Sequence, residues 1–123
     1  MYEYRATVTN VYDGDTATVN IDLGFDVILT DKRLRLRGVD TPEIRNKNLE
    51  EKKRAYEARD FVRAKIAEVN NIIFIRTHKS GKYGRYITDI WLNAEDAEEG
   101  KWETTLNNML LENNLAVEFM KND

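Results

Sequence analysis

The first third of the chain alternates apolar and polar residues, a pattern that predicts β-strands. The alternation starts around Tyr4 to Val8 and is clearest over residues 17–23, where every second position holds alanine, valine, isoleucine or leucine. A period of two places those side chains on one face of a strand. Between the two stretches, Asp13-Gly14 is typical of a tight hairpin turn, because both residues tolerate the positive φ that such turns use. A third apolar run covers residues 25–29.

A further alternating stretch combines arginines with two carboxylates. Residues 33–43 read RLRLRGVDTPE, so the arginines and the leucines fall on opposite faces of a strand. Gly38 interrupts the alternation, and Pro42 prevents further sheet pairing because it has no backbone N–H. Asp40 and Glu43 follow directly. Since guanidinium groups match phosphate oxygens, and carboxylates bind hard metal ions or accept protons, this stretch indicates phosphodiester chemistry.

The middle of the chain has the period of an amphipathic helix. Over residues 48–69, apolar residues recur at spacings of three and four, and no glycine or proline interrupts the run. Asn48 is a suitable N-cap, with Glu51 three residues later as in a capping box. The apolar stripe expected to pack on a sheet consists of Ala55, Ala58, Val62, Ile66 and Val69. We therefore predict one long helix after the first strands.

The last part of the chain predicts two more strands and a short helix. Residues 72–77 are largely β-branched and residues 86–92 largely apolar, with a basic, glycine-containing loop between them. Residues 93–101 are acidic, and we expect them to form an exposed connection. Thr104 or Thr105 could cap a final helix. This is an α+β order, and five strands with a long helix after the third suit a small barrel of the OB type.

Composition narrows the class of protein. The chain has 123 residues, no cysteine and a net charge of −3, so we expect one domain over residues 1–123, without disulfides or thiolate ligands. No segment has the apolar length of a signal peptide or a membrane span, which predicts a cytoplasmic protein that does not contact a membrane. Basic residues gather at 32–37, 45–54 and 79–85. We therefore expect any nucleic-acid binding to use a local groove and to weaken as salt rises.

Each candidate site residue also has a purely structural interpretation. On turn chemistry alone, Asp15 only completes a hairpin turn, and Arg35 could be a solvated strand residue. Glu43 could be a first-turn helix residue favoured by the helix dipole, and Arg85 a loop-end cation. The functional interpretation makes Asp15 and Asp40 ligands of one metal ion. With a backbone carbonyl and waters they would suit Ca²⁺, but spacing alone leaves open whether the two carboxylates meet.

Three motifs resemble those of the staphylococcal (thermonuclease) nuclease family. They are Asp13-Gly14-Asp15-Thr16, Arg35-Leu36-Arg37-Gly38-Val39-Asp40-Thr41-Pro42-Glu43 and Lys82-Tyr83-Gly84-Arg85, in the family's order and with the family's helix between the second and the third. The resemblance covers about residues 4–119 and implies an OB barrel with packed helices. It also implies a Ca²⁺-dependent nuclease, a hydrolase that cuts DNA and RNA and leaves 3′-phosphate ends.

The resemblance implies a metal centre with a neighbouring base. Asp15 and Asp40 resemble the carboxylate ligands of Ca²⁺, and Thr41 resembles the residue whose backbone carbonyl completes the protein's share of the ligands. Glu43 resembles the general base that activates a water held near the metal. A carboxylate within hydrogen-bond reach can accept the proton that such a water must lose.

The resemblance also implies a set of residues that contact the substrate. Arg35 and Arg85 resemble the two phosphate-binding arginines, which are suitable countercharges for the oxygens of a phosphate under attack. Lys82 and Tyr83 match positions that contact the terminal phosphate of a nucleotide in the type member. We therefore expect DNA or RNA, or both, as the substrate.

The chain also departs from the family pattern. It is acidic where the type member is basic and secreted, and its sequence stops before the family's extra C-terminal helix. The tyrosine that stacks on the base has no clear match near Phe119 and Met120. The main alternative is a catalytically silent OB-fold module that binds nucleic acid or protein, and a third is a structural domain that merely keeps the motifs. Because the catalytic and metal-binding side chains of the motifs are all present, we favour the enzyme, acting as a monomer.

Overall fold

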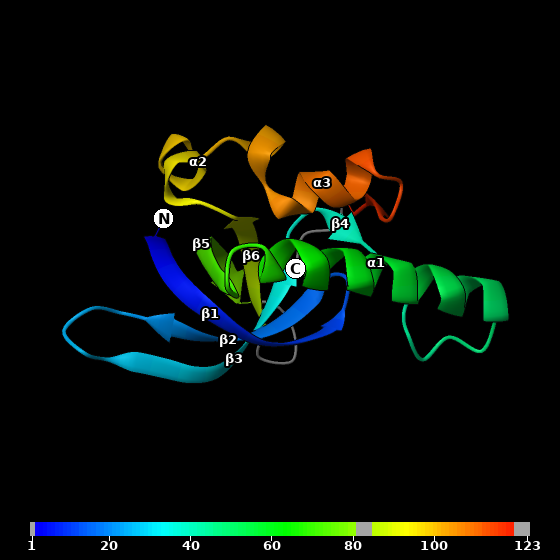
Figure 1. The fold of residues 1–123 in the computed structure, drawn as a ribbon, viewed down its shortest axis with the longest axis horizontal. Helices are drawn as coiled ribbons and strands as arrows, with labels where there is room; N and C mark the ends of the chain where they lie inside the picture. Colours follow the sequence, from blue (N-terminus) through cyan, green and yellow to red (C-terminus); the bar gives the residue numbers. More distant parts are fainter. Residues whose placement is uncertain (1, 81–84, 120–123) are drawn as a thin grey trace.

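Five strands close into a barrel that positions the rest of the chain. The computed structural model describes residues 2–80 and 85–119, and the barrel order is β1-β2-β3-β6-β5 (Figure 1). Neighbouring strands are antiparallel except for β3 and β6, which pair in parallel where Leu34 faces Tyr86. The strands are β1 (Tyr2–Asp13), β2 (Thr16–Asp22), β3 (Ile28–Leu36), β5 (Ile72–Ser80) and β6 (Tyr86–Trp91). The predicted α+β fold with a five-stranded barrel is confirmed.

The interior of the barrel is filled by the apolar face of each strand. Alternate positions on the strands point inward, as their period of two requires. The fully buried members include Val19, Leu34, Ile73, Ile75 and Ile90. The third apolar run was predicted over residues 25–29, but only residues 28–29 are in a strand, and they continue into the arginine stretch as β3, while residues 25–27 lie in the turn before it. A bulge at Asp31, whose φ is 55°, allows the strand to continue past the register shift opposite Asn20.

The predicted long helix is α1 (Leu49–Ala67), which packs against β1. The side chain of Asn48 caps it by accepting hydrogen bonds from the backbone N–H groups of Glu50 and Glu51, as its position in the sequence predicts. The helix buries the expected small and branched residues Ala55, Ala58, Val62 and Ile66. Within the described ranges, no helix combines the length and the apolar character needed to cross a membrane.

The acidic segment expected to be an exposed connection instead contains a short helix, α2 (Ala94–Glu99). Asn93 caps it by accepting from the N–H of Asp96, and Gly100 ends it in the left-handed conformation with φ 65°. Acidic residues in the first turn are favourable beside the positive end of the helix dipole. This helix was not predicted, because it has no repeated spacing of apolar residues: Ala97 is its one buried residue.

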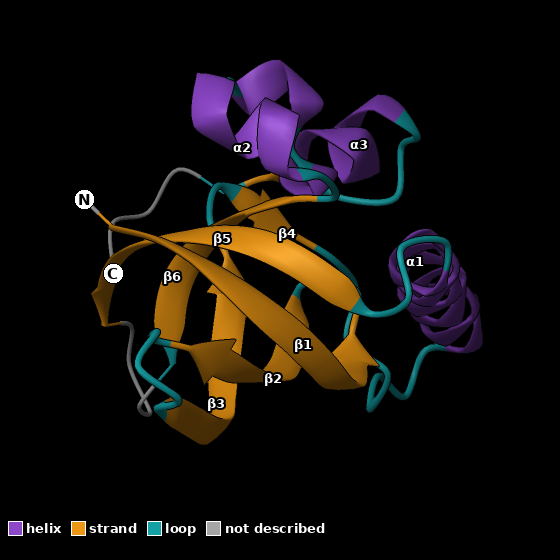
Figure 2. Cartoon of the chain, turned by 60° about the vertical axis from the view of Figure 1, so that its left-hand side comes forward, coloured by secondary structure: helices purple, strands orange, loops and turns teal. Residues whose placement is uncertain are grey.

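The final helix is α3 (Leu106–Glu112), and Thr105, one of the two predicted cap candidates, is its N-cap. It lies with α2 over one side of the barrel, whereas α1 lies over another (Figure 2). A second, two-stranded sheet pairs β4 (Val39–Asp40) with β7 (Val117–Glu118). This small sheet was not predicted, and it joins the end of the chain to the strand that carries Asp40.

Candidate functional site

The first and second motifs meet at Asp15. This residue lies in the turn between β1 and β2, and only 6% of its surface is exposed. Its Oδ2 accepts a hydrogen bond from the backbone N–H of Thr41 at 3.0 Å, and its backbone carbonyl accepts from the N–H of Leu36 at 2.9 Å. The turn is therefore fixed both to the end of β3 and to the loop after β4.

Gly14 allows the turn to contact α1 because it has no side chain, and not because of its backbone conformation. The φ of Gly14 is not in the left-handed region, so the expectation of a positive φ at this turn is wrong for Gly14. Instead, a Cβ at this position would lie 2.8 Å from the Cβ of Ala58 and 3.0 Å from the Cγ2 of Thr41. The absence of a side chain lets the turn pack directly on the helix, which sets the position of Asp15.

Arg35 lies between the two carboxylates that the sequence singled out. Its Nη1 is 3.5 Å from the Oδ2 of Asp15, and its Nη2 donates to the Oδ1 of Asp40 at 3.3 Å. Nη1 also donates to the carbonyls of Val39 at 2.7 Å and Leu36 at 3.0 Å. Only 9% of the Arg35 side chain is exposed. The interpretation of Arg35 as a solvated strand residue is therefore wrong, and its charge acts in a partly desolvated environment, where electrostatic interactions are stronger.

An aromatic ring that the sequence did not assign completes the surroundings of Arg35. The Cζ of Arg35 lies 5.3 Å from the ring centroid of Phe119. The N–H of Phe119 donates to the carbonyl of Gly38 at 2.9 Å, directly after the β4–β7 pairing. A two-residue strand pairing between distant segments leaves no periodic signal in a sequence, so neither β7 nor this contact could be anticipated.

Asp40 is the more open of the two carboxylates. Its side chain is 52% exposed, although its backbone is held by pairing with Val117. Desolvation raises the pKa of Asp40 above its ordinary value, the charge of Asp15 raises it further, Arg35 lowers it, and Glu43 raises it again. Several negative charges therefore converge here, and a cation would relieve their repulsion.

Glu43 is exposed in the loop after β4, where a second aspartate fixes the backbone. The Oδ1 of Asp13 accepts a hydrogen bond from the N–H of Ile44 at 3.2 Å. Desolvation raises the pKa of Asp13, the Ile44 hydrogen bond lowers it, and the charges of Asp15 and Glu43 raise it. Sequence reasoning treated Asp13 only as a turn residue, whereas its place two positions before Asp15 is the signal that could have identified it.

The oxygen atoms of this region match the ligand preference of Ca²⁺. Within the described part of the chain, no three histidine, cysteine or acidic residues group closely enough to hold a metal ion by themselves. The candidate donors are two carboxylates, from Asp15 and Asp40, together with Thr41. The Oγ1 of Thr41 is buried without a hydrogen-bond partner, an unusual state for a hydroxyl. Ca²⁺ takes six to eight oxygens in flexible geometry, so waters would complete such a set.

The one described residue of the third motif, Arg85, lies next to the strand that carries Arg35. Arg85 directly precedes β6, and β6 pairs with β3 so that Ile87 faces Arg35. The backbone of Arg85 is therefore close to β3, one residue before the Tyr86–Leu34 pair. Lys82 and Tyr83 lie outside the described residues.

A closed five-stranded barrel with two aspartates around a desolvated arginine defines an OB-like domain with an oxygen-rich, anion-compatible site. A family model described as "Staphylococcal nuclease homologue" matches residues 33–123, and the chain belongs to this family. The sequence has no significant match among curated proteins. Membership indicates a nuclease-type or nucleic-acid-binding function. The matched segment begins at Arg33 and does not include Asp15. The structure shows that the barrel brings Asp15 to the site.

Proposed function

We propose that the chain is a Ca²⁺-dependent nuclease that hydrolyses DNA, RNA or both and leaves 3′-phosphate ends. The observation that carries the proposal is the convergence of Asp15 and Asp40 on Arg35, within 3.5 Å and 3.3 Å. Arg35 pairs with both carboxylates, yet desolvation and the charge of Asp15 still raise the pKa of Asp40, so the arginine does not fully offset the repulsion between the two carboxylates. A site that holds a cation and a phosphate together accounts for that arrangement.

In this proposal, Asp15, Asp40 and the carbonyl of Thr41 hold Ca²⁺. Bound Ca²⁺ polarises the phosphate and offsets negative charge that develops during hydrolysis. Asp15 is kept ready by its hydrogen bonds from Thr41 N–H and Thr16 Oγ1, both 3.0 Å long. Asp40 is half exposed and can turn toward a ligand without opening the core.

Glu43 acts as the general base in this scheme. Its carboxylate is exposed, while the Asp13–Ile44 hydrogen bond restrains the loop that carries it. Removing a proton from an attacking water requires a carboxylate in hydrogen-bond reach of that water, and general bases contribute about 10²- to 10⁴-fold to rates. The loop restraint is thus part of the catalytic arrangement, because misplacement of the base by about 1 Å is costly.

Arg35 and Arg85 bind the phosphate, with Lys82 and Tyr83 as further contacts to the substrate. The Arg35 Nη2 that donates to Asp40 can donate to a phosphate oxygen instead. Arginine is suited to this exchange because its planar fork matches both carboxylate and phosphate oxygens. The contacts of Nη1 with the carbonyls of Leu36 and Val39 keep the guanidinium in place meanwhile.

A second candidate function is a catalytically silent module that binds nucleic acid or protein. The net charge of −3 favours the protein-binding form of this module, because proteins that bind nucleic acid usually present a basic surface to it. The two functions differ in one respect that is easily measured: a silent module binds its partner without any cleavage.

The experiment is digestion of labelled single-stranded DNA and of RNA by the purified protein, in Ca²⁺ and in EGTA. The proposal predicts cleavage in Ca²⁺ alone, with product ends that become extendable only after phosphatase treatment. Salt-dependent binding without cleavage, by protein that is folded according to circular dichroism, would favour the silent module instead. The variant Arg85→Ala should lower turnover while the protein stays folded.

A further inference from the structure

The loop between β2 and β3 presents a group of apolar side chains to solvent. Figure 1 shows this hairpin projecting beyond the barrel. Its tip exposes 38% of Leu23, 100% of Phe25, 49% of Val27 and 58% of Ile28. Isolated exposed apolar residues are normal, but a contiguous group at a projecting tip is typical of an interaction site.

The conformation of the tip holds the Phe25 ring away from the rest of the chain. Phe25 and Asp26 adopt φ values of 56° and 62°, as the two central residues of a type I′ hairpin turn do. The turn is closed by hydrogen bonds from the N–H of Val27 to the carbonyl of Gly24 and from the N–H of Leu23 to the carbonyl of Val27, both 2.9 Å long. The hairpin turn therefore presents the phenyl ring fully to solvent, and a partner that covers the ring would remove its apolar surface from water.

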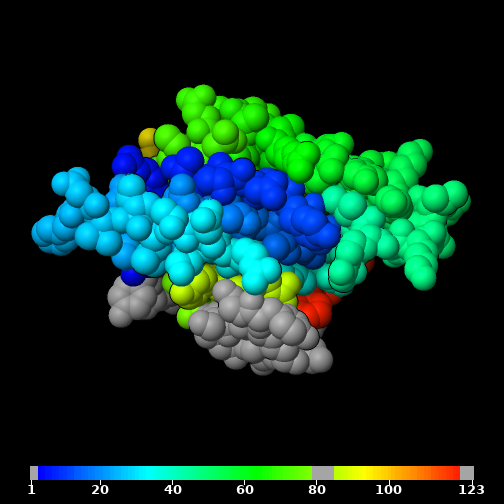
Figure 3. All heavy atoms as spheres, turned by 90° about the horizontal axis from the view of Figure 1, so that it is seen from below, coloured from blue at the N-terminus to red at the C-terminus, as the bar shows by residue number. Residues whose placement is uncertain are grey.

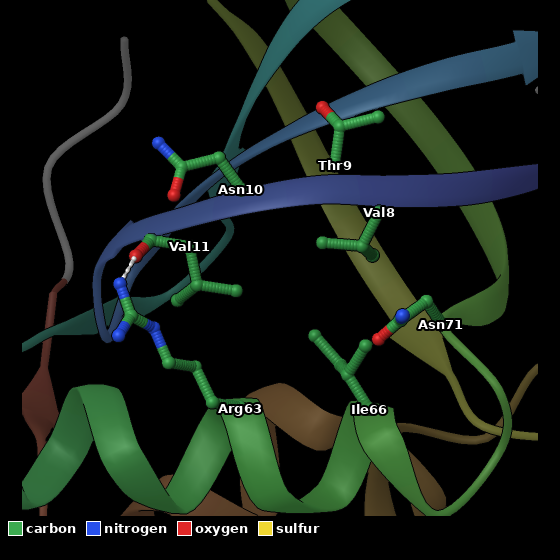
Figure 4. Close-up of a pocket in the computed structure, with 7 residues that line it drawn as sticks. All are labelled: Val8, Thr9, Asn10, Val11, Arg63, Ile66 and Asn71. Atoms are coloured by element: carbon green, nitrogen blue, oxygen red, sulfur yellow. Dashed lines mark hydrogen bonds between the residues drawn. The ribbon is translucent and has the colours of Figure 1, made fainter.

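A pocket of matching size lies between β1 and α1 (Figure 4). Its volume is about 200 Å³, and Val8, Val11 and Ile66 provide apolar side chains. The other lining residues, Thr9, Asn10, Arg63 and Asn71, are polar, and the Nη2 of Arg63 donates to the carbonyl of Val11 at 2.9 Å. A cavity of about 150 Å³ can hold benzene, so the volume of this mixed polar and apolar pocket is sufficient for a phenyl ring.

We propose that two copies of this chain form a twofold dimer in which Phe25 of each enters the β1–α1 pocket of the other. The tip and the pocket lie along the same antiparallel pair of strands, β1 and β2, in which Arg5 pairs with Asp22. Phe25 is three residues beyond Asp22, and Val8 is three residues from Arg5 in the opposite direction. At about 3.3 Å per residue this separates tip and pocket by about 20 Å.

That spacing allows a symmetric arrangement. When the β1–β2 strand pair of a second copy is placed antiparallel to the first, each tip reaches the pocket of the other copy. This is the self-complementary geometry of a twofold interface. Figure 3 shows the hairpin, β1 and α1 together on one face of the molecule. This arrangement departs from the monomer expected from the sequence, and it uses none of the residues assigned to the nuclease site.

The charges of the two surfaces favour a second copy over other occupants. Phe25 can place its ring against the guanidinium of Arg63, a cation–π contact, and the neighbouring Asp26 can pair with the same arginine. The exposed carboxylates of Asp26 and Asp31 on the hairpin would repel an anionic membrane or a nucleic acid. Because each contact involves few residues, the dimer is expected to be weak and to depend on concentration.

The test is sedimentation velocity of the wild-type chain and its variants over a range of protein concentrations. The tip variants are Phe25→Asp and Asp26→Lys, and the pocket variant is Arg63→Glu. The double variant Asp26→Lys/Arg63→Glu restores the opposite charges with reversed polarity. Leu49→Asp is the matched control, because Leu49 is 81% exposed on α1 and lies outside the pocket. Circular dichroism verifies that each variant is folded.

The proposal predicts that the wild type and Leu49→Asp shift from monomer to dimer as concentration rises. The three single variants at the tip and pocket should remain monomeric, and the double charge variant should recover the dimer. A wild type that is monomeric throughout, or Phe25→Asp that dimerises like the wild type, would overturn the proposal. So would a monomer that floats with phosphatidylcholine vesicles only when Phe25 is intact, since the tip would then bind lipid.

Discussion

The ring of Phe119 lies against the guanidinium of Arg35, with 5.3 Å between the ring centroid and Cζ. Phe119 reaches this position because β7 pairs with β4, and the N–H of Phe119 then bonds to the carbonyl of Gly38. The end of the chain therefore helps to orient the arginine to which we assign phosphate binding. It also braces the strand that carries Asp40.

Removing the ring should loosen Arg35 without unfolding the barrel. A partly desolvated cation–π contact is worth about 1 kcal/mol, so Phe119→Ala should lower kcat about fivefold. Phe119→Trp should retain most of the activity because indole offers a stronger ring face, whereas Phe119→Leu should resemble the alanine variant. Steady-state cleavage kinetics, with urea denaturation as the measure of folding, would decide. Equal rates for leucine and tryptophan would show that only packing matters.

The hydrogen bond between Asp13 and Ile44 should matter for the rate more than for the fold. Asp13→Ala removes the acceptor of the Ile44 N–H, which is bonded at 3.2 Å, and so frees the loop that carries Glu43. Misplacement of a catalytic group by about 1 Å can cost about 10²-fold in rate, so we expect a loss of at least about tenfold in kcat. Asp13→Asn keeps an acceptor oxygen and should lose less. An alanine variant as active as the asparagine variant would disprove this positioning role.

Asp40 should reduce stability when no metal is bound. Desolvation and the charge of Asp15 raise its pKa despite the opposing effect of Arg35. Asp40→Asn should therefore raise the free energy of unfolding in EGTA at pH 7. The gain should be on the order of 0.5 kcal/mol, because solvent screens this half-exposed side chain. In Ca²⁺ the order should reverse, since binding to the folded wild type stabilises it. Urea denaturation in both buffers tests this, and an asparagine variant less stable in EGTA would contradict it.

The same carboxylates predict how stability in EGTA depends on pH. The folded-state pKa values of Asp13 and Asp40 are raised above 3.8. Such a group contributes stability that is fully present below its unfolded-state pKa and is lost as pH rises through the folded-state value. The advantage of Asp40→Asn over the wild type should thus be small near pH 3.8 and should grow toward pH 7. An advantage that stays constant over this window would exclude ionisation of Asp40 as its cause.

Gly14 should be required for space and not for backbone conformation. In Gly14→Ala, the new Cβ would lie 2.8 Å from the Cβ of Ala58 and 3.2 Å from its backbone carbon. Overpacking of this kind costs about 1 to 3 kcal/mol in the free energy of unfolding. The cost should be smaller in an Ala58→Gly background, because the closest of the three neighbouring atoms, the Cβ of Ala58, is then absent and only the Cγ2 of Thr41 and the backbone carbon of residue 58 remain. A double-mutant cycle by urea denaturation measures this coupling, and additive effects would argue against the clash.

Sequence reasoning succeeded where a pattern is local and repeated. Period-two alternation identified the strands, and the stripe that includes Ala58 and Val62 identified the long helix. The caps at Asn48 and Thr105 were predicted from side-chain chemistry alone. These features depend on neighbours in the sequence, so tertiary structure did not need to be known.

The features that sequence reasoning missed depend on contacts between distant segments. Arg35 alternates like a solvent-facing residue, yet the turn at Asp15 and Phe119, the residue after β7, cover it from both sides. Asp13 has the sequence environment of a turn residue, and only the fold brings Ile44 to it. Likewise, α2 has one buried residue, Ala97, too few to produce a periodic pattern.

The most direct measurement for the central claim is the single-turnover cleavage rate of Glu43→Gln in saturating Ca²⁺, together with its Ca²⁺ affinity by calorimetry. Glutamine keeps the size and polarity of the side chain but cannot take up a proton at neutral pH. We predict a rate at least about 10²-fold below wild type with an almost unchanged Ca²⁺ affinity. Cleavage at the wild-type rate would contradict the assignment of Glu43 as the general base, and absence of Ca²⁺ binding by the wild type would contradict the proposed nuclease itself.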